Sequence, residues 1–277
     1  MGPCALGSSS LVVTANASDA VRMVLESTTT PRSLPAAARA AWQHLVGMVV
    51  SPPPTRPVAL PAPVVRWWRH VLGDAPAPTR AKLTMHGEIR LGRWRPFTAV
   101  QLLTPKGLVW AARVGRWPLR ITGADRYIEG VGTMNWRLAG LLPVLNAGGP
   151  DITRSAAGRH AAELVALLPG AVGEPTLRWL ELDETTARAR VAHGTSTHEV
   201  TIRVDEVGAL RTVSLPRWGN PDGGAFAEHR FGVDFADEVT FGGITMPRTL
   251  RAGWWHGTPR AAAGEFFRAT IDHAMFW

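Results

Sequence analysis

The spacing of hydrophobic residues changes along this chain from a helical period to a strand period. Pro35 to Val49 and Val64 to Leu72 have the spacing of helices, and Ser18 or Asn16 could cap an earlier helix that reaches Leu25. A stiff proline-rich connector, SPPPTRPVALPAP at residues 51–63, lies between the first helices and the remainder. We therefore predict an N-terminal helical segment with its connector at residues 1–60, packed on a main domain at 61–277.

Strict alternation begins at about Leu83, where Leu83 and Met85 alternate with Thr84 and His86. Similar runs follow, joined by two to five turn residues, which is typical of antiparallel hairpins because parallel crossovers need a dozen or more residues. Besides the run from Leu83, the predicted strands cover residues 97–103, 108–114, 119–128, 133–138, 187–191, 200–204, 211–215, 230–241, 244–255 and 265–273.

One helix interrupts the strands between Asp151, a predicted N-cap, and Leu168, where Pro169 and Gly170 end it. No alternation of strands and helices suggests a parallel sheet. A sheet of about eleven strands must curl or split. We therefore predict an α+β fold: a curled antiparallel half-barrel whose open side is covered by helices and whose interior holds an apolar cavity.

Composition limits the classes of function. The chain has 277 residues, 45% of them hydrophobic, which suffices for one sizeable core. Cys4 is the only cysteine, so neither an internal disulfide nor a cysteine-based metal site can form. The net charge of +8 comes from arginines scattered along the whole chain, since Lys82 and Lys106 are the only lysines. Without a clustered basic stripe, nucleic-acid binding is not expected.

The sequence offers no clear membrane span or signal peptide. The most apolar stretch, Leu34 to Val50, carries Arg39, Gln43 and His44, whereas a span needs about 18 apolar residues. Residues 1–14 lack the basic start and cleavage site of a signal peptide. We expect a cytoplasmic protein.

Several stretches carry a family resemblance: WRPFTAVQLL, GLVWAARVG, GADRYIEGVGTM, GPDITRSAAGRHAAE, LPRWGNPDGG, VTFGGITMP, RAGWW and GEFFRATI. Through them, residues 64–276 resemble an uncharacterised bacterial family, a domain of unknown function. The strand pattern is also similar to the half-barrel, or β-clam, of outer-membrane lipoprotein carriers. Many family members begin with membrane segments and this chain does not, which favours a free cytosolic role. The family supplies no catalytic residue.

The central helix carries polar residues four apart: Asp151, Ser155, Arg159 and Glu163. They share one helix face. If this face looks into the half-barrel, Glu163 and Arg159, with His160 beside them, are candidates for acid–base chemistry or substrate binding. The alternative is a solvated ion pair on a surface helix.

Asp125 and Tyr127, the only tyrosine, lie two apart on a predicted strand and so face the same way. A carboxyl and a phenol directed into an apolar cavity could protonate or orient a substrate oxygen. The alternative is a tyrosine hydrogen-bonded within a packed wall.

Twelve tryptophans indicate a roomy aromatic interior, although they could equally fill a core. We predict that Trp110, Trp136, Trp254 and Phe267 help to bind a substrate. His193, His198 and His229 do not form a recognisable metal motif. No glycine-rich phosphate loop and no GxSxG nucleophile motif is present.

Two functions fit these patterns. The first is a cofactor-free cyclase or isomerase of secondary metabolism, which closes a ring or spiroketal on a large polyketide-like substrate. Asp125, Asp151 and Glu163 would be its acids and bases, and Tyr127 and His160 would orient the substrate. The second is a carrier that binds a lipid or another hydrophobic molecule without chemistry. Neither needs a cofactor or a metal.

Overall fold

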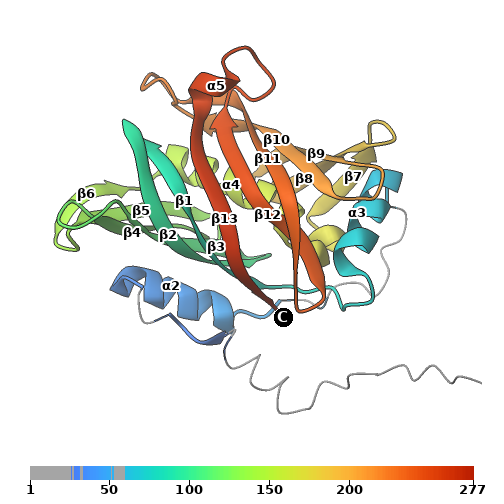
Figure 1. Ribbon diagram of the computed structural model, residues 1–277, viewed down its shortest axis with the longest axis horizontal. Coiled ribbons are helices and arrows are strands. Elements are labelled where there is room, and N and C mark those ends of the chain that lie inside the picture. Colours follow the sequence, from blue (N-terminus) through green and yellow to red (C-terminus); the bar gives the residue numbers. More distant parts are fainter. Residues whose placement is uncertain (1–25, 27, 32–33, 51, 53–59) are drawn as a thin grey trace, which may run out of the picture.

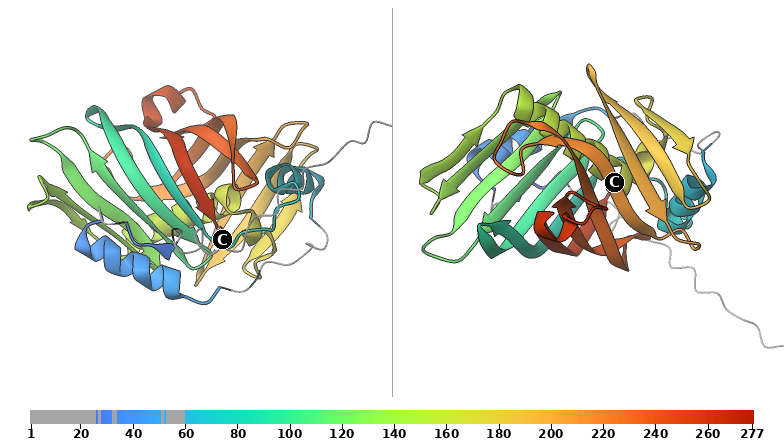
Figure 2. Two further views of the ribbon diagram at one scale, coloured as in Figure 1. Left: turned by 60° about the horizontal axis from the view of Figure 1, so that its bottom comes forward. Right: turned by 90° about the horizontal axis from the view of Figure 1, so that it is seen from above.

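The computed structural model describes residues 26, 28–31, 34–50, 52 and 60–277 (Figures 1 and 2). In this part of the chain, thirteen antiparallel strands form one curled sheet with the order β6-β5-β4-β3-β2-β1-β13-β12-β11-β10-β9-β8-β7. The strands are β1 Ala81–Leu91, β2 Arg93–Thr104, β3 Gly107–Val114, β4 Ile121–Ile128, β5 Val131–Leu138, β6 Leu142–Ala147, β7 Leu177–Glu181, β8 Thr186–His193, β9 Ser196–Val204, β10 Leu210–Gly219, β11 Ala227–Phe241, β12 Ile244–Trp254 and β13 Glu265–Phe276.

Alternation along each strand decides which side chains enter the main core. In β3, Leu108 and Trp110 belong to the large core on the concave face, whereas Val109 and Ala111 belong to a smaller core on the convex face. Both faces of β3 are therefore buried.

Helix α4 (Pro150–Leu167) lies within the curve of the sheet, where it contacts β10 on one side and β5 on the other (Figures 1 and 2). Gly132 of β5 permits this approach, because a Cβ there would lie 2.7 Å from the Cα of Thr153 in α4. A 3-10 turn, Pro169–Gly173, follows α4. The helix thus fills part of the concave side and fixes where its polar residues point.

Among the described residues, two helices precede the sheet and a short one lies near its end. Helix α3 (Ala62–Leu72) packs its buried Trp67 and Val71 into the main core and contacts β12. Helix α2 (Ala36–Gly47) places Trp42 and Leu45 on the convex face of β3 and β4. The single turn α5 (Ala261–Gly264) leads into β13. None of the described helices is long and apolar enough to cross a membrane.

The predicted curled antiparallel half-barrel and its central helix are confirmed. The sheet has thirteen strands rather than about eleven, because the two edge strands do not show alternating hydrophobic and polar residues. Strand β6 is exposed along its length and contains Pro143, and β7 has only five residues. One detail was wrong: Asp151 does not cap α4, whose N-cap is Gly149. Helix α2, from the predicted N-terminal helical segment, covers the outer face of the sheet. The helix predicted to end at Leu25 and most of the connector lie outside the described residues; the division into two domains stays a prediction.

Candidate functional site

A network of charged and polar side chains lies between α4 and the concave face of the sheet. We call Gln101, Asp125, Arg159 and Glu163 the ion network. Arg159 donates to both acids, from Nη1 to Asp125 Oδ2 at 3.1 Å and from Nε to Glu163 Oε1 at 2.7 Å. Gln101 Nε2 donates to Glu163 Oε2 at 2.5 Å. Arg159 is therefore shared between two carboxylates.

Local structure brings these four residues together. Arg159 and Glu163 are one helical turn apart on α4, so they lie on the same face. Asp125 occupies a concave position of β4, two residues before Tyr127. Gln101 occupies a concave position of β2, between the core residues Ala99 and Leu103. The sequence left open which way this face of α4 looks; in the structure Arg159 and Glu163 point toward Asp125.

Aromatic side chains surround the ion network and limit its contact with water. Trp136 Nε1 donates to Asp125 Oδ1 at 2.9 Å, and the Arg159 guanidinium lies 5.2 Å from the Trp110 ring centroid. The side chains of Asp125, Arg159 and Glu163 are only 20–21% exposed. Burial raises the pKa of the Asp125 carboxyl, and Arg159 and the bond from Trp136 act in the opposite direction without cancelling the effect.

Arg217 of β10 is a second cation near the network. Its guanidinium lies 4.6 Å from the centroid of Phe231 and 5.4 Å from that of Trp254, and its Nε donates to Ser155 O at 3.4 Å. It forms no ion pair with any carboxylate in the described part of the chain. Burial and the nearby Arg159 lower the pKa of Arg217 to about 10, so it remains charged at neutral pH.

The predicted substrate-binding aromatic residues lie on the concave face, in two groups. Trp110 contacts Trp136 at 5.8 Å and Phe267 at 5.9 Å between ring centroids, while Trp254 contacts Phe231 at 5.3 Å. Trp110 and Trp136 are buried, and Trp254 and Phe267 are only partly buried. Within each group the rings pack on one another. The predicted apolar cavity with these residues as its wall stays a prediction.

Other predicted site residues form a separate group, the histidine cluster: Tyr127, His160, His193 and His198. His160 follows Arg159 directly, so it points about 100° away around the helix. Its Nε2 lies 2.8 Å from Thr104 O and its Nδ1 lies 3.0 Å from His193 Nε2. The rings of Tyr127 and His160 are 5.3 Å apart, and those of His193 and His198 are 5.8 Å apart.

The histidine cluster is built to stay neutral. Desolvation lowers the pKa of His160, and desolvation and the two neighbouring histidines lower the pKa of His193 to about 3. With His160 Nε2–H donating to the Thr104 carbonyl, its Nδ1 can accept from His193 Nε2–H, which requires a neutral imidazole. Burial also raises the pKa of Tyr127. These groups therefore contact one another.

Asp151 does not join the other predicted acids. It lies in the first turn of α4, where its Oδ1 accepts a hydrogen bond from Trp218 Nε1 at 2.8 Å at an exposed position. Eight residues separate it from Arg159, which is about 12 Å along a helix axis. The structure thus brings together Asp125 and Glu163 and leaves Asp151 apart.

Sequence reasoning missed two polar residues that contribute to the interior. Gln101 is the only polar side chain in the apolar run from Ala99 to Leu103, and a polar residue at a core position of a strand needs a partner. Arg217 lies two residues after the core residue Leu215 and so shares its face. The strand periodicity alone would have placed Gln101 and Arg217 on the core faces of their strands.

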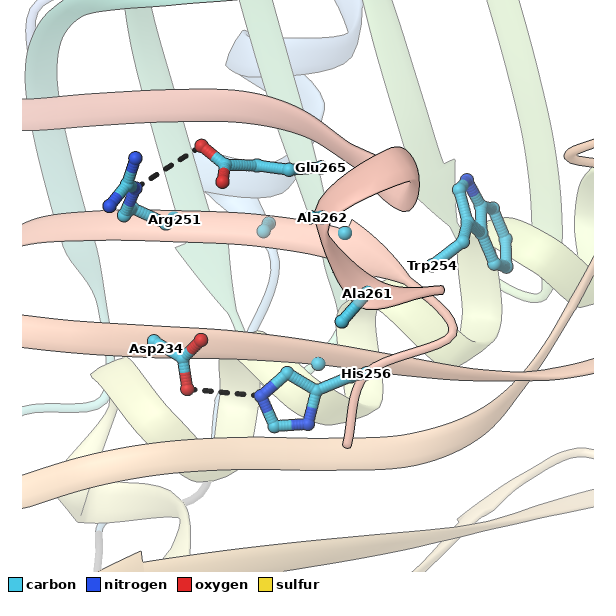
Figure 3. A pocket seen from close by; sticks show the side chains of 10 residues that line it. Asp234, Arg251, Trp254, His256, Ala261, Ala262 and Glu265 are labelled. Atoms are coloured by element: carbon cyan, nitrogen blue, oxygen red, sulfur yellow. Dashed lines mark hydrogen bonds and ion pairs between the residues drawn. The ribbon is translucent and has the colours of Figure 1, made fainter. Parts of the chain in front are cut away.

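A small pocket of about 150 Å³ lies elsewhere, on the convex face where β11, β12 and β13 meet α5 (Figure 3). Two polar contacts line it: a hydrogen bond between His256 and Asp234 at 3.0 Å, and an ion pair between Arg251 and Glu265 at 3.1 Å. Ligand sites begin at about 300 Å³, so this pocket is small for a ligand. Among the residues described here, no group of three or more His, Cys, Asp or Glu side chains could hold a metal ion.

Comparison with known proteins places the chain in a family. No curated protein sequence matches it significantly. The solved structures that are similar include the following two. A domain assigned to outer membrane lipoprotein sorting, from Vibrio parahaemolyticus, is 9% identical with a TM-score of 0.41, over 71% of this chain and 85% of that one. A LolA superfamily protein from Nitrosomonas europaea is 8% identical with a TM-score of 0.43, over 79% and 94%.

A family model described as "Family of unknown function (DUF6544)" matches residues 52–266, which is most of the chain and most of the stretch predicted from the sequence motifs. This chain belongs to that family of unknown function.

Proposed function

We propose that the protein binds a hydrophobic ligand on the concave face of its half-barrel and carries it without covalent change. One observation carries this proposal: all four carboxylate oxygens of the ion network already accept a hydrogen bond. Asp125 accepts from Trp136 and Arg159, and Glu163 accepts from Arg159 and Gln101. The network stabilises the interior, and the acids have no oxygen left without a partner for proton transfer to a substrate.

The groups that remain available to a ligand are mostly aromatic. Trp254, Phe266 and Phe267 are partly buried at the edge of the main core, so each keeps some exposed ring surface. Such surface suits an apolar ligand, since burying it is favourable by roughly 25 cal/mol per Å². Arg217 adds a cation beside Trp254 that could meet a polar group of the same ligand.

The test is to identify what the protein holds and which residues hold it. Native mass spectrometry of the purified protein should show a bound hydrophobic molecule. Trp254→Ala should weaken its binding, by about tenfold for loss of one well-packed aromatic contact. Trp94→Ala is the matched control, because Trp94 stacks with Arg268 rather than with the concave aromatic residues. If neither variant changes binding, the ligand lies elsewhere and the proposal is wrong.

A second candidate is the cofactor-free cyclase. One observation favours it: the buried Asp125 has a raised pKa and shares Arg159 with Glu163, so two carboxyl groups lie in the same network. Two carboxyl groups held close together can divide acid and base roles in ring closure on a polyketide-like substrate.

The two candidates differ in turnover. For a cyclase, the wild type converts the linear precursor to a cyclic product, and Asp125→Asn or Glu163→Gln lowers the rate by about 10²–10⁴ while the protein stays folded. For a carrier, the wild type binds the precursor and releases it unchanged, and neither variant alters its fate. Mass spectrometry of the released ligand, with circular dichroism of each variant, separates these outcomes.

A further inference from the structure

Exposed hydrophobic side chains gather on two loops and an edge strand at one end of the sheet. Trp117 in the β3–β4 loop is 73% exposed, and Leu141 in the β5–β6 loop is 76% exposed. The two loops are adjacent, because the Ala139 amide donates to Arg120 O at 2.8 Å. We call the exposed set the loop patch; it comprises Trp117, Leu119, Leu141, Leu142, Val144 and Leu145.

The loop patch lies where the sheet ends. β6 pairs with β5 on one side and is the terminal strand of the sheet, at the left in Figure 1. Singly exposed apolar residues are ordinary on a protein surface, whereas a contiguous group marks an interaction site. Six large apolar side chains on adjacent segments meet the second description.

The charged residues on the two stretches that carry the loop patch are all arginines. Arg116 and Arg120 flank Trp117 and Leu119 directly, and Arg137 lies at the β5–β6 loop, where its Nη1 donates to Leu141 O at 3.3 Å. Residues 113–121 and 137–147 contain no aspartate or glutamate. All three arginines are exposed, and Arg116 and Arg120 pair with no carboxylate in the described part of the chain.

We propose that the loop patch docks the protein on the surface of an anionic lipid bilayer. Tryptophan and leucine side chains on loops can enter the interfacial region, and unpaired arginines beside them attract anionic headgroups. The absence of acidic residues from both stretches removes the repulsion that would oppose this orientation. Contact is peripheral, since it uses loops and an edge strand. This inference stands independently of what the concave face binds.

The test is co-sedimentation of the full chain with vesicles. We expect binding to vesicles of phosphatidylcholine with about one third phosphatidylglycerol, and weak binding to phosphatidylcholine alone. Arg116→Glu with Arg120→Glu should weaken binding at least about tenfold, because each basic residue near the surface contributes about 1 kcal/mol. Trp117→Ser with Leu141→Ser should weaken it on both kinds of vesicle.

A matched double variant controls for net charge. Arg203→Glu with Arg248→Glu removes two exposed arginines on other strands and lowers the charge equally. It should keep near-full binding, and equal loss in both double variants would show non-specific attraction and overturn the proposal. A second copy of the chain is the competing occupant. Two results together would show that the loop patch is a dimer interface instead. Sedimentation equilibrium would show a dimer that dissociates in the Leu141→Ser and Leu142→Ser variants, and the wild type would not bind anionic vesicles.

Discussion

Replacing Arg159 with methionine should destabilise the protein strongly, because it leaves two acids in the interior without their shared cation. Arg159 makes two charge-assisted hydrogen bonds, at 2.7 and 3.1 Å. Each such bond contributes about 1.5–3 kcal/mol, and removing one partner of a buried ion pair costs about 3–5 kcal/mol. Since the three side chains are about one fifth exposed, water screens part of the cost, and we expect a loss near the lower limit, about 3 kcal/mol.

The loss should depend on pH in a direction that the structure dictates. Without Arg159, the pKa of Asp125 in the folded state rises further above its unfolded value of about 4, because Arg159 is the cation that lowers it. At a pH between the unfolded and the folded pKa of Asp125, the folded state then binds more protons than the unfolded state. The destabilisation is therefore full at about pH 8 and smaller at about pH 5.

Urea unfolding at both pH values measures the effect, and a neutral background provides the control. In a chain carrying Asp125→Asn and Glu163→Gln, the Arg159→Met change should cost less than about 1 kcal/mol, because no carboxylate remains to be stranded. The reasoning is refuted if Arg159→Met costs the same in both backgrounds, or if its cost does not change with pH.

Three further predictions concern other parts of the fold. His193→Gln should flatten the pH dependence of stability: the pKa of His193 is lowered to about 3, so its contribution is present above pH 6.5 or so and is lost as pH falls, by up to about 1.4 kcal/mol per pH unit; parallel unfolding curves for wild type and variant would contradict this. Gly132→Ala should cost about 1–3 kcal/mol by pushing α4 from β5, whereas Gly148→Ala, whose Cβ would meet nothing closer than 3.8 Å, should cost clearly less in the same urea assay. Trp42→Ala should cost about 3–5 kcal/mol, since this fully buried ring joins α2 to the convex face; a cost below about 1 kcal/mol would mean that α2 is not docked there.

The strand pattern predicted most of the architecture because buried faces enforce alternation. Val200, Ile202 and Val204 in β9 are all buried on one face, as their spacing indicates. Exposed edge strands carry no such signal, so Leu142–Ala147 gave no warning of β6. The mistaken cap at Asp151 has a similar origin, because its carboxylate is engaged by Trp218, a residue 67 positions away that no local rule includes.

The candidate site was predictable only in part. Spacing placed Arg159 and Glu163 on one helix face and Asp125 on one strand face, but whether the two faces meet depends on how α4 lies in the curve of the sheet. The spacing rule also shows that His160 points in a different direction from Arg159, since adjacent residues on a helix are about 100° apart. It could not show which residues His160 contacts there. Tertiary placement, not local pattern, divides the ion network from the histidine cluster.

The position of β13 has a consequence for how this protein forms during synthesis. β1 to β6 follow one another across one half of the sheet, and β7 to β12 do so across the other. β13 pairs with both β12 and β1, so that Ala81 lies opposite Phe276. During synthesis the two half-sheets therefore emerge first, and the backbone N–H and C=O groups along the edges of β1 and β12 stay unpaired until β13 emerges. Loss of β13 would leave two separate half-sheets whose unpaired edges can aggregate, rather than a slightly shortened protein.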